Sequence, residues 1–228
     1  SVHQQSPKER DEPIKPDTLT IDISASSKAE AEKYVSPGDC AYFRSDYTEL
    51  GNGYLREKAL DDRIGCAIMV DILNKDLPYD VTCVFTVQEE IGTRGAKVAA
   101  YTVKPDYAIV LETTTACDFS GNDGEKRVCE LGKGCVVSYM DRSTIYDREL
   151  YRLGFEKAKE IGVPCQTKTL VAGGNDSGAI HSSVGGIRTV ALSVPCRYLH
   201  SPSCMIKKSD VQSTAELAYA MYLALAEK

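Results

Sequence analysis

The chain has 228 residues, of which 43% are hydrophobic and 26% are charged, as in an ordinary globular protein. Its net charge of -6 and the absence of a clustered Lys/Arg run argue against a nucleic-acid-binding surface. No stretch approaches the length of a transmembrane helix, and no signal peptide is visible. The nine cysteines are scattered without a C-x-x-C pair, which favours reduced thiols and a cytoplasmic protein over a disulfide framework.

The first 57 residues predict part of a small β-rich unit. Residues 1–17 are polar and contain three prolines, which indicates a loop or an extended arm. Residues 19–23 alternate apolar and polar side chains as a half-exposed strand does, and residues 40–43 predict a second short strand. Residues 27–34 predict a short helix between them. These elements are too few to make a closed domain.

The stretch around which the remaining chain is organised is TCVFTVQEEIGTRG, residues 82–95. Residues 82–87 are uncharged and rich in β-branched side chains, so they predict a strand buried on both faces of a parallel or mixed sheet. Glu89 and Glu90 would follow at its carboxyl end, where ligands bind in open α/β sheets. Because neighbouring side chains of an extended backbone point to opposite sides, we expect the two glutamates to have different functions, such as metal ligand and general base.

Strands and helices alternate over the rest of the chain. Apolar runs without charges predict strands over residues 107–111, 136–139 and 187–194. Capping residues and apolar periodicity predict five helices. The first begins at Asp61 or Asp62, the second covers residues 96–101, and the third runs from Asp147 to Ile161. The fourth runs from Asn175 or Asp176 to Ser182, and the last begins at a Ser209-x-x-Gln212 capping box. This alternation predicts an α/β domain in which helices flank a mixed central sheet.

Several residues that can bind metals fall where the predicted strands end or the predicted helices begin. They are Asp61 or Asp62, Glu89 or Glu90, Glu112, and His200. Carboxylates and one imidazole that converge at one sheet edge suit one or two divalent ions such as Zn²⁺, Co²⁺ or Mn²⁺. A further carboxylate nearby could then act as general base. Any one of these residues alone would more often be structural, so the hypothesis depends on their coincidence.

Four motifs in a fixed order make the chain similar to a known family. They are KALDDRIG at 58–65, VQEEIGTRGA at 87–96, GGNDSGAIH at 173–181 and SVPCRYLHSP at 193–202. Together they closely resemble the TET-type metallo-aminopeptidases of clan MH, the glutamyl aminopeptidase group, some members of which have been labelled endoglucanases. The resemblance implies a zinc-peptidase-like fold and removal of N-terminal residues from short peptides. It also implies self-association, through dimers, into large hollow particles.

The resemblance implies a role for each of five residues. Asp61 would bridge two metal ions, through a cis link to Asp62. Glu90 would bind one ion, Glu112 would bind the other, and His200 would complete the site. Glu89 would be the catalytic general base and acid, which takes a proton from the attacking water and passes it to the leaving amine. The cofactors would be two divalent ions per subunit, Zn²⁺ or Co²⁺.

The chain departs from the family pattern in one metal ligand. The family supplies a further histidine from an H-x-D motif, and no H-x-D occurs here. His3 lies in a segment that resembles the inserted lid of the family and does not replace this ligand. Residues 1–57 resemble the later part of that lid or dimerisation domain, and residues 58–228 resemble a catalytic domain without its beginning. We therefore expect an N-terminally truncated chain.

Two alternative functions stay open at this point. The missing ligand allows an inactive truncated subunit or assembly piece. A glycoside hydrolase would need two carboxyl groups about 5–5.5 or 6.5–9.5 Å apart across a sugar cleft, usually lined with aromatic residues. This chain has no Trp and only four Phe, which disfavours that reaction. Metal content and the release of free amino acids would separate the three possibilities.

Overall fold

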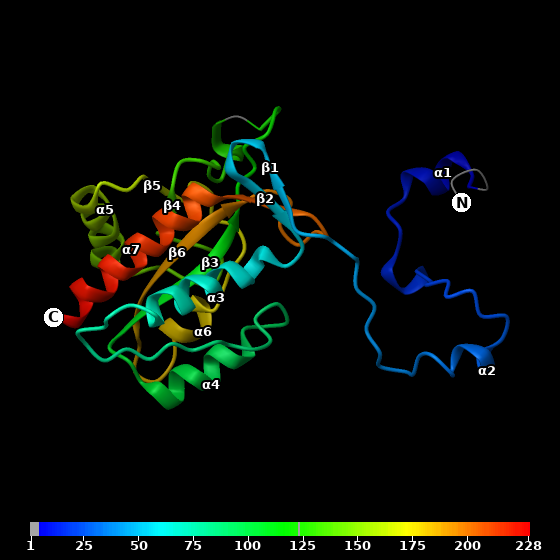
Figure 1. The fold of residues 1–228 in the computed structure, drawn as a ribbon, viewed down its shortest axis with the longest axis horizontal. Helices are drawn as coiled ribbons and strands as arrows, with labels where there is room; N and C mark the ends of the chain where they lie inside the picture. Colours follow the sequence, from blue (N-terminus) through cyan, green and yellow to red (C-terminus); the bar gives the residue numbers. More distant parts are fainter. Residues whose placement is uncertain (1–4, 123) are drawn as a thin grey trace. The chain divides into compact units, whose positions relative to one another are not determined.

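The computed structural model describes residues 5–122 and 124–228 in two compact units, Ser1–Phe43 and Arg44–Lys228. In the described part of the first unit, the regular elements are α1 (Pro7–Asp11), the 3-10 turn η2 (Pro16–Thr18) and α2 (Lys28–Ala31) (Figure 1). The short helix predicted over residues 27–34 is therefore present, and it begins where the Ser27 side chain accepts a hydrogen bond from the Glu30 N–H.

The two strands predicted in this first unit are not formed. Residues 19–23 and 40–43 are irregular, and Leu19 and Ile21 are 65% and 71% exposed. An alternating pattern can bury its apolar face only against another element, and these residues have no ladder partner within the described chain. The prediction of strands over residues 19–23 and 40–43 is therefore wrong.

The strands that follow belong to the second unit. They form an antiparallel sheet in the order β1 (Thr48–Leu50), β2 (Tyr54–Glu57) and β7 (Cys204–Lys207). The turn between the first two strands, η3 (Gly51–Gly53), places Asn52 at a φ of 64°. The compact units thus divide after Phe43 rather than after Glu57, because β2 pairs with a strand near the end of the chain. The role of residues 1–57 as a lid stays a prediction.

The main sheet of the second unit is mixed, as predicted. Its strand order is β3 (Tyr107–Thr115), β6 (Arg188–Cys196), β4 (Cys135–Val137) and β5 (Cys165–Thr167). β3 runs parallel to β6, whereas β4 runs antiparallel to β6 and parallel to β5. Glu112 lies inside β3, in register with Ser193 of β6, rather than beyond the end of the strand.

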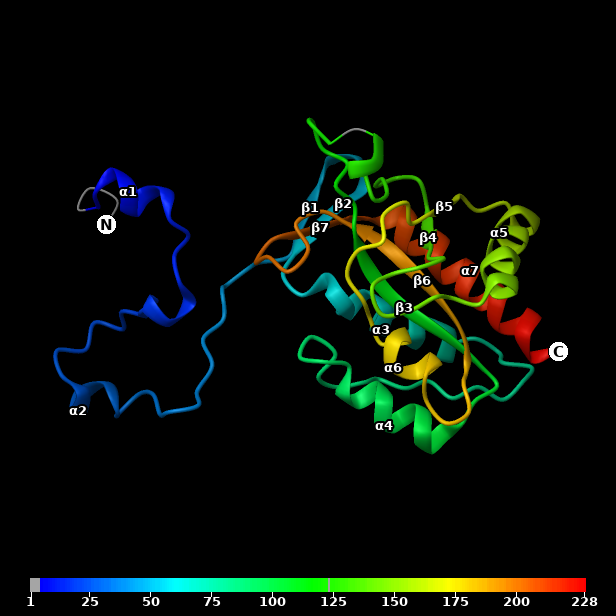
Figure 2. The ribbon, with the colours of Figure 1, turned by 180° about the vertical axis from the view of Figure 1, so that it is seen from behind.

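Helices cover both faces of this sheet (Figures 1 and 2). On one face, Val190, Leu192 and Val194 of β6 pack in the same buried cluster as Leu217 and Met221. The helices on this side are α7 (Lys208–Ala226), which packs on β6 and β4, and α3 (Leu60–Leu73) and α5 (Arg148–Ile161), which pack against α7. No helix of the described residues is both long and apolar enough to cross a membrane.

The cluster of buried side chains on the opposite face of the sheet is smaller. There Ala191 of β6 and Val110 of β3 are buried together with Tyr146, and Ile180 packs against them. Ile180 belongs to α6 (Ser177–His181), which lies next to α4 (Arg94–Val103). β6 is therefore buried on both faces, which explains its nearly continuous apolar sequence.

Helix starts were predicted with mixed success. Asp61 and Asp62 have non-helical φ/ψ, and the Asp62 Oδ1 accepts a hydrogen bond of 3.0 Å from the Gly65 N–H, so Asp62 is the capping residue. Asp147 caps α5 as predicted. The Ser209-x-x-Gln212 capping box is wrong, because α7 already begins at Lys208 and no side chain caps it.

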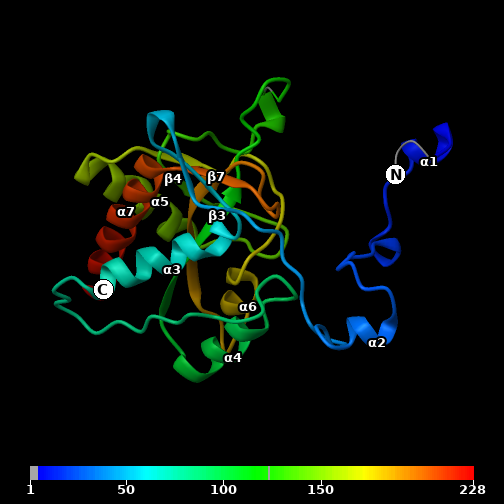
Figure 3. The same ribbon diagram turned by 45° about the vertical axis from the view of Figure 1, so that its right-hand side comes forward.

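The prediction of a central buried strand over residues 82–87 is also wrong. This segment is irregular and runs between α3 and α4 (Figure 3). Phe85 and Val87 are 47% and 66% exposed. A cleft of about 1320 Å³ is lined by this segment, by residues 107–112 of β3, and by residues of α3 and α4. The β-branched composition fits a strand, but the cleft leaves the segment without a neighbour to complete a ladder.

Candidate metal centre

Three predicted ligands converge at one point of the second unit. His200 Nε2 lies 3.3 Å from Asp61 Oδ2 and 3.4 Å from Glu90 Oε2. One ligand atom from each of the three residues lies within 4.8 Å of the others. The Asp61 side chain is only 13% exposed, whereas Glu90 and His200 are 59% and 64% exposed. The group is therefore enclosed at Asp61 and open to solvent at Glu90 and His200.

A second group is formed by Asp61, Asp62 and Glu112, whose carboxylate oxygens also lie within 4.8 Å of one another. Burial, reinforced by the charges of Asp62 and Asp61, raises the pKa of Glu112 far above its ordinary value. Burial also raises the pKa of Asp62 to about 8. Enclosed carboxylates of this kind favour their protons unless a cation neutralises them.

The two groups fit divalent ions by their chemistry and arrangement. Asp61 belongs to both groups, which is the position that a bridging ligand needs, and the predicted cis peptide bond joins it to Asp62. The donors are carboxylate oxygens and one imidazole nitrogen, a set that suits Zn²⁺, Co²⁺ or Mn²⁺. The sequence left Asp61 or Asp62 open as a ligand, and the resemblance gave that role to Asp61 alone. The Asp62 carboxylate accepts a hydrogen bond from the Gly65 N–H.

The side chains of Glu89 and Glu90 enter different environments, as expected, but the cause is a turn rather than the alternation of an extended strand. Gln88 has a φ of 60°, and the Glu89 carbonyl accepts hydrogen bonds from the Gly92 and Thr93 N–H groups, so both glutamates lie on a tight turn rather than at a strand end. Glu90 enters the group around His200, whereas Glu89 lines the cleft. Burial, together with the charges of Asp176 and Glu90, raises the pKa of Glu89 to about 7.

Asp176 is a neighbour of this site to which sequence reasoning gave no role. Thr86 Oγ1 donates a hydrogen bond of 2.6 Å to Asp176 Oδ2. Asp176 is 7% exposed, and its Oδ1 has no hydrogen-bond partner among the described residues. Burial raises the pKa of this carboxyl. Its position in a glycine-rich loop at a helix start was the one sequence signal that could have drawn attention to it.

His181 does not add to the centre. His181 ends α6, and its Nδ1 lies 2.8 Å from the Ser177 carbonyl oxygen. His3 lies outside the described residues. Within the part of the chain that the structure describes, the group of Asp61, Asp62 and Glu112 therefore consists of carboxylates alone.

Comparison with known proteins identifies the family. The model of the M42 glutamyl aminopeptidase family matches residues 1–217. A protein of Acetivibrio thermocellus is 41% identical over 203 residues, which cover 87% of this chain and 60% of that protein. The TET aminopeptidase of Thaumarchaeota archaeon SCGC AB-539-E09 superposes with a TM-score of 0.90 at 32% identity, covering 96% of this chain and 63% of that one.

A third relative is the TET1 peptidase of Pyrococcus horikoshii, which can assemble into a tetrahedron or a large octahedral shell. It is 33% identical with a TM-score of 0.77, and the match covers 90% of this chain and 59% of that one. The chain thus spans about three fifths of the length of these proteins. The extent and identity of these matches show that the chain belongs to the M42 glutamyl aminopeptidase family.

Proposed function

We propose that the protein is a metal-dependent aminopeptidase that hydrolyses N-terminal residues from short peptides. The observation that carries this proposal is the arrangement of two three-residue ligand groups that share Asp61, with Glu89 on the adjoining cleft. Membership of the M42 family supports the reaction class.

The ligands divide between two ions in this proposal. Asp61, Glu90 and His200 would hold one ion, and Asp61 and Glu112 would hold the other. We assign Zn²⁺ or Co²⁺ because the donor set contains an imidazole as well as carboxylates. When bound, such ions supply Lewis acidity, which polarises a peptide carbonyl and makes water a stronger acid.

Glu89 acts as the general base and acid. It accepts a proton from the attacking water at a carboxylate oxygen and then donates that proton to the leaving amine. A pKa of about 7, raised first by burial, supports this role because the group can both accept and release a proton near neutral pH. The neighbouring Asp176 carboxylate contributes to this raised pKa.

We further propose a cytoplasmic protein that self-associates through dimers into hollow particles. The nine cysteines are all free thiols, which supports a reducing compartment. The likeness to a TET1 peptidase that assembles into closed shells supports self-association.

Metal analysis combined with a peptidase assay tests the proposal. The chain is loaded with Zn²⁺ or Co²⁺, and its metal content and its release of amino acids from unblocked and N-acetylated peptides are measured. We expect about two ions per chain and cleavage of unblocked peptides alone. Glu89→Gln should keep the metal and lower kcat by about 10²- to 10⁴-fold, the usual contribution of a general base. Glu160→Gln, at an exposed side chain paired with Lys157, is the control and should leave kcat unchanged.

The same assay separates the alternatives. A chain that binds one ion or none and cleaves no peptide would be an inactive subunit or assembly piece. Release of reducing sugar from a soluble β-glucan, without peptide cleavage, would identify a glycoside hydrolase instead.

A further inference from the structure

The loop that carries His200 connects β6 to β7 and has an unusual backbone. Tyr198 and His200 both have a φ of 58°. Residues other than glycine rarely adopt this left-handed conformation, and they keep it only when surrounding contacts hold them there. The contacts around this loop therefore bear on where the His200 imidazole lies.

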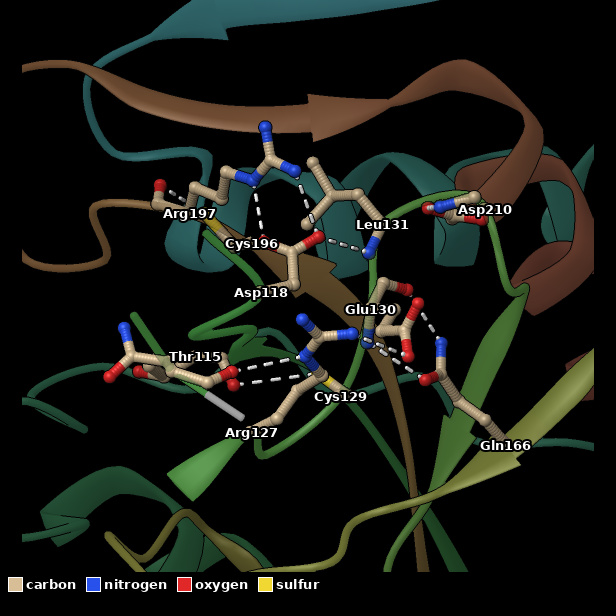
Figure 4. Close-up of polar contacts among 12 residues, drawn as sticks. Thr115, Asp118, Arg127, Cys129, Glu130, Leu131, Gln166, Cys196, Arg197 and Asp210 are labelled. Atoms are coloured by element: carbon tan, nitrogen blue, oxygen red, sulfur yellow. Dashed lines mark hydrogen bonds and ion pairs between the residues drawn. The ribbon is translucent and has the colours of Figure 1, made fainter. Parts of the chain in front are cut away.

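The strongest of these contacts is an ion pair at the start of the loop (Figure 4). Arg197 Nε donates to Asp118 Oδ1 at 2.5 Å, and Arg197 Nη2 donates to Asp118 Oδ2 at 2.9 Å. Asp118 also accepts a hydrogen bond of 3.0 Å from the Leu131 N–H, and its side chain is only 5% exposed. Burial alone would raise the pKa of Asp118, but these hydrogen bonds outweigh it and lower the pKa. The pair is bidentate and enclosed, which fixes the orientation of both partners.

Three further contacts reinforce the same connection. The Tyr198 ring stacks on the Phe119 ring, with centroids 6.3 Å apart and an interplanar angle of 20°. The backbone of Arg197 exchanges two hydrogen bonds with Met205, of 2.9 and 3.0 Å. The guanidinium of Arg197 also lies 6.0 Å from the centre of the Tyr54 ring on β2. The two residues that begin the His200 loop are thus each held by a side-chain contact.

These contacts connect the segment after β3, the strand that carries Glu112, to the start of the loop after β6, which carries His200. β3 and β6 are parallel neighbours, and Thr115 at the end of β3 lies opposite Cys196 at the end of β6. Asp118 follows the strand that carries Glu112, and Arg197 is the first residue of the loop that carries His200. We call Asp118, Phe119, Arg197 and Tyr198 the clamp.

We propose that the clamp positions the His200 imidazole against Asp61 and Glu90, and that Arg197 thereby sets the metal affinity of this group. Arg197 does not touch a ligand, so its role is that of a positioning residue. The inference rests on the metal site of the proposed function. The inference goes beyond that function because Arg197, which belongs to neither ligand group, controls the affinity of the group of Asp61, Glu90 and His200 for a metal ion.

β6 itself offers a matched control at its other end. Arg188 Nε donates to Asp147 Oδ2 at 2.6 Å, and Arg188 Nη2 donates to Asp147 Oδ1 at 3.1 Å. This pair has the same two-bond geometry on the same strand, but it lies at the first residue of β6 rather than just after the last. Arg188 Nη2 also donates to Glu149 Oε2 at 2.6 Å, so Arg188→Gln removes the pair with Asp147 and this further bond without touching the loop of His200.

Binding of Co²⁺ to the purified chain, followed by visible absorption and by calorimetry, tests the proposal. The variants are Arg197→Gln, Arg197→Lys, Phe119→Leu and Arg188→Gln. We expect Arg197→Gln to weaken Co²⁺ binding by about tenfold or more and to change the absorption spectrum, as loss of outer-shell support does. Arg197→Lys keeps the charge but loses the planar fork, so it should fall between Arg197→Gln and wild type. Arg188→Gln should bind Co²⁺ as wild type does.

Thermal unfolding of each variant shows that it is folded at the titration temperature. Phe119 is 44% exposed, so Phe119→Leu provides a milder test if Arg197→Gln unfolds, and we expect it to weaken binding by a few-fold. Wild-type affinity and spectrum in folded Arg197→Gln would overturn the inference, as would an equal loss in Arg188→Gln. A wild-type chain that bound no Co²⁺ would instead contradict the proposed metal-dependent function itself.

Discussion

Asp147 combines two functions in one side chain. It caps α5 by accepting hydrogen bonds from the Glu149 and Leu150 N–H groups, and it pairs with Arg188 on β6. The Arg188 hydrogen bond is the largest cause of a pKa held below the usual value for this carboxyl. The side chain thus joins the start of a helix to the start of a strand.

This pairing makes a prediction about stability and pH. The folded state lowers the pKa of Asp147, so its ionised carboxylate adds to the free energy of unfolding. This contribution is fully present above the unfolded pKa of about 3.9 and is lost as the pH falls through the lower folded pKa. We expect Asp147→Ala to lower the free energy of unfolding at pH 7 by about 1–2 kcal/mol, mainly through the lost cap. Denaturant unfolding at pH 7 and at steps below pH 4 measures the difference, which should shrink on acidification.

A control variant separates this effect from general surface charge. Asp46 pairs with Arg44, but both side chains are largely exposed. Exposed pairs contribute little, so Asp46→Ala should leave the free energy of unfolding within about 0.5 kcal/mol of wild type. A difference for Asp147→Ala that stays constant down to pH 2 would show that its charge plays no part.

At the scale of elements, residues 82–87 and β6 have similar apolar sequences and opposite environments. β6 has a ladder neighbour on each side and helices on both faces. Residues 82–87 border a cleft, and within the described chain their backbone N–H groups donate no hydrogen bond. The composition of a segment therefore did not decide whether it became a strand.

Hydrogen exchange distinguishes the two segments. Amides of residues 190–194 should exchange only through global or large-scale opening, whereas those of residues 82–87 should exchange by local motion. We expect the latter to exchange faster by a factor of at least about 10² at pH 7 and 25 °C, measured by NMR or mass spectrometry. Slow exchange across residues 82–87 would mean that they pair with a strand in solution.

At the scale of the whole molecule, the two compact units differ in their internal organisation. The second unit contains the sheets, the buried clusters and the ligand groups. In the described part of the first unit, residues 5–43, three short helical elements are separated by irregular segments, and Ile14, Tyr34 and Tyr42 are 69%, 75% and 78% exposed. Proteases preferentially cleave exposed, irregular segments such as these.

Limited proteolysis with trypsin should therefore begin in the first unit. We expect the first cuts after Lys28, Lys33 or Arg44, followed by accumulation of a fragment that begins at Ser45. Intact-mass analysis over time identifies the sites, and the chain unfolded in urea serves as the control for cleavage without structure. Early cuts within residues 60–73 or 148–161 would contradict this division, because those residues form α3 and α5.

The sequence by itself determined the features that depend on neighbouring residues. The start of α5 at Asp147 and its end before Gly162 follow from the cap and from a φ of 74° that glycine tolerates. The apolar runs of β3 and β6 were also found, and the ordered motifs selected Asp61, Glu90 and His200, which the fold brings together. Glu112 was selected as the carboxylate that follows the predicted strand over residues 107–111, and it meets Asp61 in the second group.

Only the tertiary structure decided the features that depend on distant partners. The clamp joins Asp118 to Arg197, 79 positions apart, because β3 and β6 are neighbours in the sheet. Thr86 and Asp176 are 90 positions apart, and their contact places a carboxylate beside Glu89. Residues 82–87 had the composition of a strand but no ladder partner. Side-chain chemistry specifies which groups can interact, and the order of the strands specifies which of them meet.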